Sequence, residues 1–189
     1  WCLIHCTQMQ RHETRALAAT GAVAGLCPVT ESSLGDGIFD GVAWMGAGGR
    51  WGIGSDSNIR ISLSEELRTL EHSQRLRDHS RAALARAERS TGRVLLDGAA
   101  RGGARATGRD AGGIKEGRLA DLLALDTARI DLEGRMGDTL LDAYIFAADD
   151  RAISDVWAAG RHLVSGGRHA RHQEISAAYR KVANRLRAL

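Results

Sequence analysis

Three short apolar runs, separated by segments with helical character, occupy the first part of the chain. The runs are Trp1 to Ile4, Ala22 to Cys27 and Arg50 to Ser55, and the segments between them are Met9 to Thr20 and Ile38 to Met45. Strands and helices that alternate through short turns are typical of a parallel sheet with right-handed crossovers. The sequence therefore predicts an α/β fold for this part of the chain.

Polar residues follow the first and the third of these runs. His5 comes directly after the first run, and Asp56 ends the segment Gly54-Ser55-Asp56 after the third. Because the carboxyl ends of parallel strands lie at one edge of a sheet, we expect both side chains to face the same site. A histidine and a carboxylate there suit a hydrolytic metal site, in which the carboxylate binds zinc and accepts a proton from the attacking water. Two other interpretations stay open: a hydrogen-bonded structural His5, and an Asp56 that N-caps the next helix.

The middle of the chain predicts one loop and two helices. Residues 28–37 are polar and too many for a simple connection, so we expect a loop that lines or covers the site. Helix formers extend from Ser64 to Glu88, and a second helix, rich in small residues, is predicted from Gly92 to about Ala106. A glycine cluster at residues 46–49 precedes a strand. Trp51 stands where a dinucleotide-binding fingerprint needs its third glycine, so this cluster is interpreted as a turn.

A smaller β unit is predicted to begin near residue 112. A tight turn there leads into a short apolar strand between Asp121 and Asp126, and residues 153–167 have the pattern of a β-hairpin around Gly160.

The tail from Glu174 to Leu189 has the pattern of a basic amphipathic helix. The apolar residues of one face are Ile175, Tyr179, Val182 and Leu186. We expect this face to pack on the body of the protein rather than on a membrane.

Composition narrows the classes of protein that fit. A chain that is 43% hydrophobic and 26% charged is typical of soluble globular proteins. The net charge is only +3, and arginines alternate with acidic residues, which favours solvated helix faces over a nucleic-acid surface. The three cysteines lack C-x-x-C spacing, which argues against a disulfide framework and a zinc knuckle and favours a reducing cytoplasm. We find no apolar stretch long enough to span a membrane and no signal peptide.

Several blocks of residues resemble one enzyme family. The strand-end residues His5 and Asp56, followed by the segment Gly117 to Asp126, resemble the C-terminal half of the amidohydrolase superfamily. Within it, the chain is similar from Trp1 to Gly167 to the formimidoylglutamate deiminases of histidine breakdown. The blocks that carry this narrower resemblance are residues 20–28, Thr30-Glu31, Leu34-Gly35-Asp36-Gly37-Ile38-Phe39, 65–68 and 74–78.

The resemblance implies a fold. It is a distorted (β/α)8 barrel with a small β-sandwich, and this chain is expected to carry strands 6 to 8 of the barrel and the C-terminal portion of the sandwich. The implied units are barrel residues 1–111, sandwich residues 112–168 and a C-terminal helix over 169–189.

The resemblance also implies one zinc ion and a reaction. Asp56, at the end of the eighth strand, is expected to bind the zinc and shuttle a proton, and His5, at the end of the sixth, to assist the attacking water. The implied reaction converts N-formimino-L-glutamate and water to N-formyl-L-glutamate and ammonia. Thr30 and Glu31, after the seventh strand, are candidates for contact with the substrate.

Part of this implied site lies outside the sequence. The chain opens at Trp1 directly in an apolar run, and the other zinc ligands and the arginines that hold the substrate carboxylates are expected upstream of Trp1. A complete barrel takes roughly 250 residues, so we expect the isolated chain to be inactive, to bind zinc poorly and to expose sheet edges. As partners we expect a small-molecule substrate and no nucleic acid or membrane, and a homodimer is the assembly considered.

Two other functions remain open at this point. Another deaminase of the superfamily, acting on a purine, pyrimidine or triazine, is the first. A non-catalytic fragment or binding module is the second. The zinc deaminase fold that acts on nucleic acids is disfavoured because its P-C-x-x-C signature is absent: Cys27 precedes Pro28, and no cysteine follows.

Overall fold

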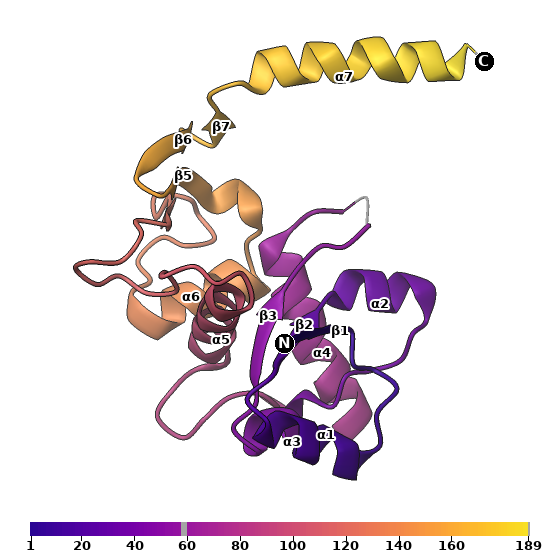
Figure 1. Ribbon diagram of the computed structural model, residues 1–189. Helices are drawn as coiled ribbons and strands as arrows, with labels where there is room; N and C mark the ends of the chain where they lie inside the picture. The colour runs from indigo at the N-terminus through magenta and orange to yellow at the C-terminus, as the bar shows by residue number, and fades with distance from the viewer. Residues whose placement is uncertain (58–59, 189) are drawn as a thin grey trace.

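The N-terminal part of the chain forms a parallel sheet. The computed structural model describes residues 1–57 and 60–188 (Figure 1). The strands, in sheet order, are β1 (Cys2–Ile4), β2 (Val23–Leu26) and β3 (Arg50–Ile53). The helices between them are α1 (Arg11–Ala19), α2 (Pro28–Leu34) and α3 (Gly41–Gly46). The predicted alternation of strands and helices is confirmed, and the three carboxyl ends lie at one edge of the sheet.

Helix α2 replaces the loop that the sequence predicts over residues 28–37, so that prediction is wrong. Pro28 is the first residue of the helix, where its fixed φ fits and its missing N–H is not needed. Gly35 ends the helix with a φ of 72°, a left-handed conformation that glycine adopts without strain. The segment is therefore a short helix that begins directly after β2.

Glu66, on α4 (Leu63–Asp78), is hydrogen-bonded to the first turn of α2. Its side chain is only 2% exposed, and Oε2 accepts a hydrogen bond from the Val29 main-chain N–H at 2.8 Å. Its Oε1 has no hydrogen-bond partner among the described residues. Burial raises the pKa of Glu66 to about 7, and the nearby charges of Glu31 and Glu65 add to the effect. Folding thus favours the protonated form of this carboxyl.

Helix α4 ends at Asp78, earlier than the predicted end at Glu88. His79 closes the helix in a left-handed conformation with a φ of 50°. Beyond it, the buried carboxylate of Glu71 accepts hydrogen bonds from the main-chain N–H groups of residues 83–84, at 2.8 and 3.0 Å. These bonds fold the chain back along α4, which is why the helix formers there do not extend it.

Helix α5 (Thr91–Ala106) packs closely on β3, as its small residues predict. Gly98 and Gly102 face Trp51 of the strand. A Cβ on Gly102 would overlap the main-chain carbonyl of Trp51, whereas a Cβ on Gly103 would meet no atom within 4 Å. The contact between helix and strand therefore depends on Gly102 in particular.

The core lies between the parallel sheet and helices α3 to α6. Helix α6 (Gly137–Phe146) packs against α4 and α5. Fully buried side chains come from every layer and include Leu26, Trp44, Leu67, Leu95 and Tyr144. The burial of these side chains removes apolar surface from water and supplies the main driving force for folding.

A second, antiparallel sheet follows in the order β4-β5-β6-β7. Its strands are β4 (Leu122–Leu125), β5 (Ile153–Ala158), β6 (Arg161–Ser165) and β7 (Arg168–His169), and the short 3-10 helix η1 (Asp150–Ala152) precedes β5. Ala159 and Gly160 turn between β5 and β6 with φ values of 48° and 77°, so the predicted hairpin is confirmed. The division at residue 112 stays a prediction.

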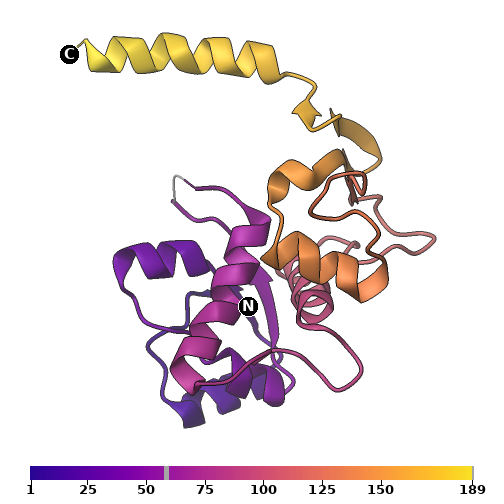
Figure 2. The same ribbon diagram turned by 180° about the vertical axis from the view of Figure 1, so that it is seen from behind.

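Helix α7 (His172–Arg187) extends away from the rest of the chain (Figures 1 and 2). None of its residues is buried, and the four apolar residues of its predicted packing face are between 50% and 69% exposed. The prediction that this face packs on the body is therefore wrong for the described chain, and Leu189 lies outside the described residues. Within residues 1–57 and 60–188, no helix is long and apolar enough to cross a membrane.

We predict that Gly102→Ala lowers the free energy of unfolding by at least about 3 kcal/mol, because the added Cβ must displace the main chain of β3. Gly103→Ala, one position along the same helix, is the matched control and should raise the free energy of unfolding by roughly 0.5 to 1 kcal/mol. Urea denaturation measures both variants. Equal effects at the two positions would contradict the close packing of α5 on β3.

A second prediction concerns Glu66 and pH. Its folded-state pKa of about 7 lies above the ordinary value of 4.5, so its contribution to stability is complete below pH 4.5 and is lost as the pH rises through 7. Glu66→Gln cannot titrate, so the stability of the variant relative to the parent should rise by about 3 kcal/mol between pH 4.5 and 8. Urea denaturation across this range tests the prediction, and a difference that does not change with pH would refute it.

Candidate functional site

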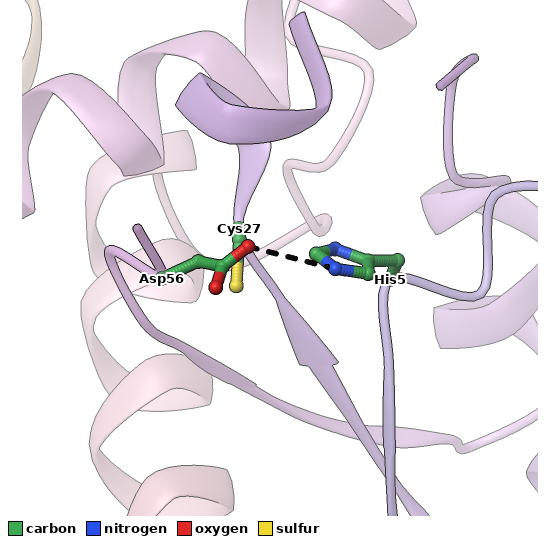
Figure 3. Close-up of side chains that lie close together, drawn as sticks. All are labelled: His5, Cys27 and Asp56. Carbon is green, nitrogen blue, oxygen red and sulfur yellow. Dashed lines mark ion pairs between the residues drawn. The ribbon is translucent and has the colours of Figure 1, made fainter. Parts of the chain in front are cut away.

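Three side chains meet where the strands of the parallel sheet end. His5 follows β1, Cys27 follows β2 and Asp56 follows β3. One potential metal-binding atom from each, an imidazole nitrogen, the Sγ and a carboxylate oxygen, lie within 4.8 Å of one another (Figure 3). The structure therefore brings the two predicted site residues together and adds a thiol between them.

The backbone at two of these positions adopts an uncommon conformation. His5 and Asp56 have φ values of 67° and 51°, in the left-handed region that residues with a side chain rarely occupy. Sheet pairing holds the chain up to these points: the His5 N–H donates to the Gly25 carbonyl at 2.8 Å, and the Gly54 N–H donates to the Leu26 carbonyl at 2.9 Å. Such strain persists where the surroundings impose it, and it is concentrated at functional sites.

The imidazole of His5 lies between two carboxylates. Its Nδ1 is 3.2 Å from Oε1 of Glu31, and its Nε2 is 3.7 Å from Oδ2 of Asp56, the contact dashed in Figure 3. The same Oε1 of Glu31 accepts a hydrogen bond from the Cys27 main-chain N–H at 2.8 Å. Glu31 thus links the end of β1 to the end of β2. His5 is hydrogen-bonded, as the structural interpretation proposed, and it also faces Asp56.

Asp56 does not N-cap the helix that follows it, so that interpretation is wrong. The N-cap of α4 is Ser62, whose hydroxyl oxygen accepts a hydrogen bond from the Glu65 N–H at 3.3 Å. The carboxylate of Asp56 is instead directed toward His5 and Cys27 (Figure 3). Thr30, on α2, donates its hydroxyl to the Ser55 carbonyl at 3.1 Å and so ties α2 to the end of β3.

The site carries an excess of negative charge. Burial raises the pKa of the Cys27 thiol to about 11, and the carboxylates of Glu31, Asp56 and Glu66 add to this effect. Burial also raises the pKa of Glu31, although its hydrogen bonds from Cys27 and His5 oppose the shift. A cluster of carboxylates around one thiol and one imidazole favours a bound cation.

The donor set fits a zinc ion. Imidazole nitrogen and carboxylate oxygen are both common zinc ligands. The Cys27 thiol stays protonated at neutral pH when no metal is bound, so it is the weakest donor of the three. Of these three residues, His5 and Asp56 therefore offer the stronger donors for a metal ion.

Sequence reasoning missed Cys27 as a site residue and the contact of Glu31 with His5. Cys27 follows a parallel strand, as His5 and Asp56 do. This position after a strand is the sequence signal that could have identified it. The contact between Glu31 and His5 joins residues 26 positions apart and depends on how α2 packs. No pattern in the sequence indicates it.

The comparisons with known proteins agree on one family. A model of the Amidohydrolase family matches residues 2–163. A formimidoylglutamate deiminase of Pseudomonas aeruginosa is 47% identical over 98% of this chain, which spans 41% of that protein's length. The crystal structure of an amidohydrolase from Brucella melitensis is 48% identical, with a TM-score of 0.91 over 98% of this chain and 41% of that one. An adenosine deaminase from Xanthomonas campestris, solved with bound zinc, is 25% identical, with a TM-score of 0.86 over 100% of this chain and 43% of that one. The chain belongs to the amidohydrolase family.

Proposed function

We propose that this chain is the C-terminal part of a zinc-dependent deiminase. The proposed reaction hydrolyses N-formimino-L-glutamate to N-formyl-L-glutamate and ammonia. The observation that carries the proposal is the meeting of His5 and Asp56 at the carboxyl edge of the parallel sheet, 3.7 Å apart. The identity of 47% to the Pseudomonas aeruginosa deiminase supports this choice of substrate.

We also propose an architecture, which the same similarity supports. Strands β1 to β3 correspond to strands 6 to 8 of a (β/α)8 barrel, and β4 to β7 belong to a small β-sandwich. The proposed boundaries are residues 1–111 for the barrel part, 112–168 for the sandwich part and 169–189 for the terminal helix. The remaining zinc ligands and the groups that bind the substrate carboxylates are then expected in a region of the full-length protein that corresponds to the part of the relative outside this match.

We propose a role for each of the two site residues. Asp56 would hold a zinc ion through its carboxylate and would accept the proton that the attacking water loses. His5 exchanges a proton at Nε2, the nitrogen that faces Asp56. Zinc, when bound, supplies Lewis acidity that makes water nucleophilic at neutral pH. The reaction balances because the water oxygen becomes the formyl oxygen and both water protons end on the imino nitrogen, which leaves as ammonia.

A second candidate is deamination of a purine. The zinc-bound adenosine deaminase from Xanthomonas campestris shares the fold at a TM-score of 0.86, although its identity is only 25%. The strand-end residues alone fit both reactions, because both hydrolyse a C–N bond.

We also propose a cytoplasmic location, consistent with three free cysteines, and a homodimer is the assembly to test.

The substrate test uses the full-length protein that carries this chain. We expect release of ammonia from N-formimino-L-glutamate and no turnover of adenosine or guanine. A coupled ammonia assay with the zinc-loaded protein measures all three substrates. Turnover of a purine without turnover of N-formimino-L-glutamate would replace the first candidate by the second.

The residue test compares Asp56→Asn and His5→Asn in the same protein. Asparagine tolerates the left-handed backbone at both sites, so the substitutions change the chemistry with little added strain. We expect Asp56→Asn to lower both zinc content and kcat, and His5→Asn to lower kcat by about 100-fold or more. His79→Asn, at the left-handed end of α4, is the matched control and should leave both quantities unchanged. Near-normal turnover of both site variants with zinc bound would refute these roles.

A further inference from the structure

We propose that Glu31 is a positioning residue, which holds His5 in the tautomer that carries its proton on Nδ1 and leaves the Nε2 lone pair facing Asp56. The inference deepens the proposed function, because it rests on His5 acting in the same site. It assigns to Glu31 a role other than contact with the substrate.

The hydrogen-bond pattern at Glu31 determines where the His5 proton lies. The main-chain N–H of Cys27 can only donate, and it donates to Oε1 of Glu31 at 2.8 Å. That oxygen is therefore an acceptor. Nδ1 of His5 lies 3.2 Å from the same oxygen, and an ionised Glu31 has no hydrogen to donate, so Nδ1 is the donor in this contact. A neutral imidazole carries one proton, which leaves Nε2 unprotonated.

The carboxylate of Glu31 is held firmly in place. Its side chain is only 6% exposed and projects from α2. In the first turn of this helix, the Val29 N–H donates to a second carboxylate, that of Glu66. Thr30, the residue before it, is bonded to the end of β3. Rotation of Glu31 away from His5 would leave the buried Cys27 N–H without its acceptor, which is unfavourable. Hydrogen bonds thus hold α2 to α4, to the end of β3 and, through Glu31, to the ends of β1 and β2.

The other imidazole nitrogen is left free for chemistry. Nε2 is 3.7 Å from Oδ2 of Asp56, beyond hydrogen-bond distance, and has no hydrogen-bond partner among the described residues. A carboxylate that accepts from one ring nitrogen fixes the tautomer and the ring orientation. Glu31 thus prepares His5 to accept a proton at Nε2. An unconstrained histidine prefers the opposite tautomer, with its proton on Nε2.

The experiment observes the tautomer directly. In the full-length, zinc-loaded protein labelled with 15N-histidine, long-range 1H–15N correlation spectra at a pH where His5 is neutral distinguish protonated Nδ1 from protonated Nε2. We expect protonated Nδ1 in the parent protein. Glu31→Gln can present its amide oxygen to both donors, so it should keep this tautomer while losing the negative charge. Glu31→Ala should shift His5 toward protonated Nε2.

Kinetics provide the second readout. With N-formimino-L-glutamate, we expect Glu31→Gln to lower kcat about tenfold and Glu31→Ala about 100-fold, with KM little changed, because Glu31 acts through His5. Glu66→Gln is the matched control: it alters a buried glutamate that also accepts a main-chain N–H of α2, but does not contact His5. It should leave the tautomer unchanged.

Two results would overturn the inference: protonated Nε2 in the parent protein, or an equal tautomer shift in Glu66→Gln and Glu31→Ala. The first result is measured on the parent protein, so it does not depend on the folding of any variant. If the protein shows the expected tautomers but releases no ammonia from N-formimino-L-glutamate, the substrate assignment is wrong and the role of Glu31 stands.

Discussion

Parallel pairing of β1, β2 and β3 is the constraint on which the site depends. The register places Ile4 beside Gly25 and Leu26 beside Ile53, so the three strands end at nearly the same level. The next residues of each chain segment therefore emerge at one edge of the sheet. This pairing, rather than any contact between the side chains themselves, brings an imidazole, a thiol and a carboxylate within 4.8 Å of one another. His5 and Asp56, which lie just beyond the paired residues, both have positive φ values.

Helix α2 turns this edge of the sheet into an ordered site. It starts immediately after β2, and its first turn is bonded to a glutamate from α4, to the end of β3 and to the end of β1. Two of these bonds use buried carboxyls, Glu31 and Glu66, and burial raises the pKa of each. Burying these two acids is energetically unfavourable, but both lie next to the site, where they constrain the geometry of His5 and of the backbone around it.

The sequence was sufficient for the features that local pattern determines. Apolar runs separated by helical segments predict the parallel sheet, and position at a strand end predicts that His5 and Asp56 lie at the same edge of it, as they do. Helix α2 lacks the apolar periodicity that marks a helix, because its composition is polar, although Pro28 and Gly35 mark its two ends. The contact of Glu31 with His5 and the raised pKa of Glu66 depend on packing between distant segments, which local pattern does not encode. For α7 the amphipathic pattern was correct, but the described chain provides no surface that covers it.

The central claim is that Asp56 is a zinc ligand at the carboxyl edge of this sheet. A crystal structure of the full-length, zinc-loaded protein, with anomalous difference density collected at the zinc edge, tests it most directly. The account predicts a single zinc peak with an Asp56 carboxylate oxygen at about 2.0 to 2.2 Å. A zinc peak elsewhere in the protein, with Asp56 not among its ligands, would contradict the account.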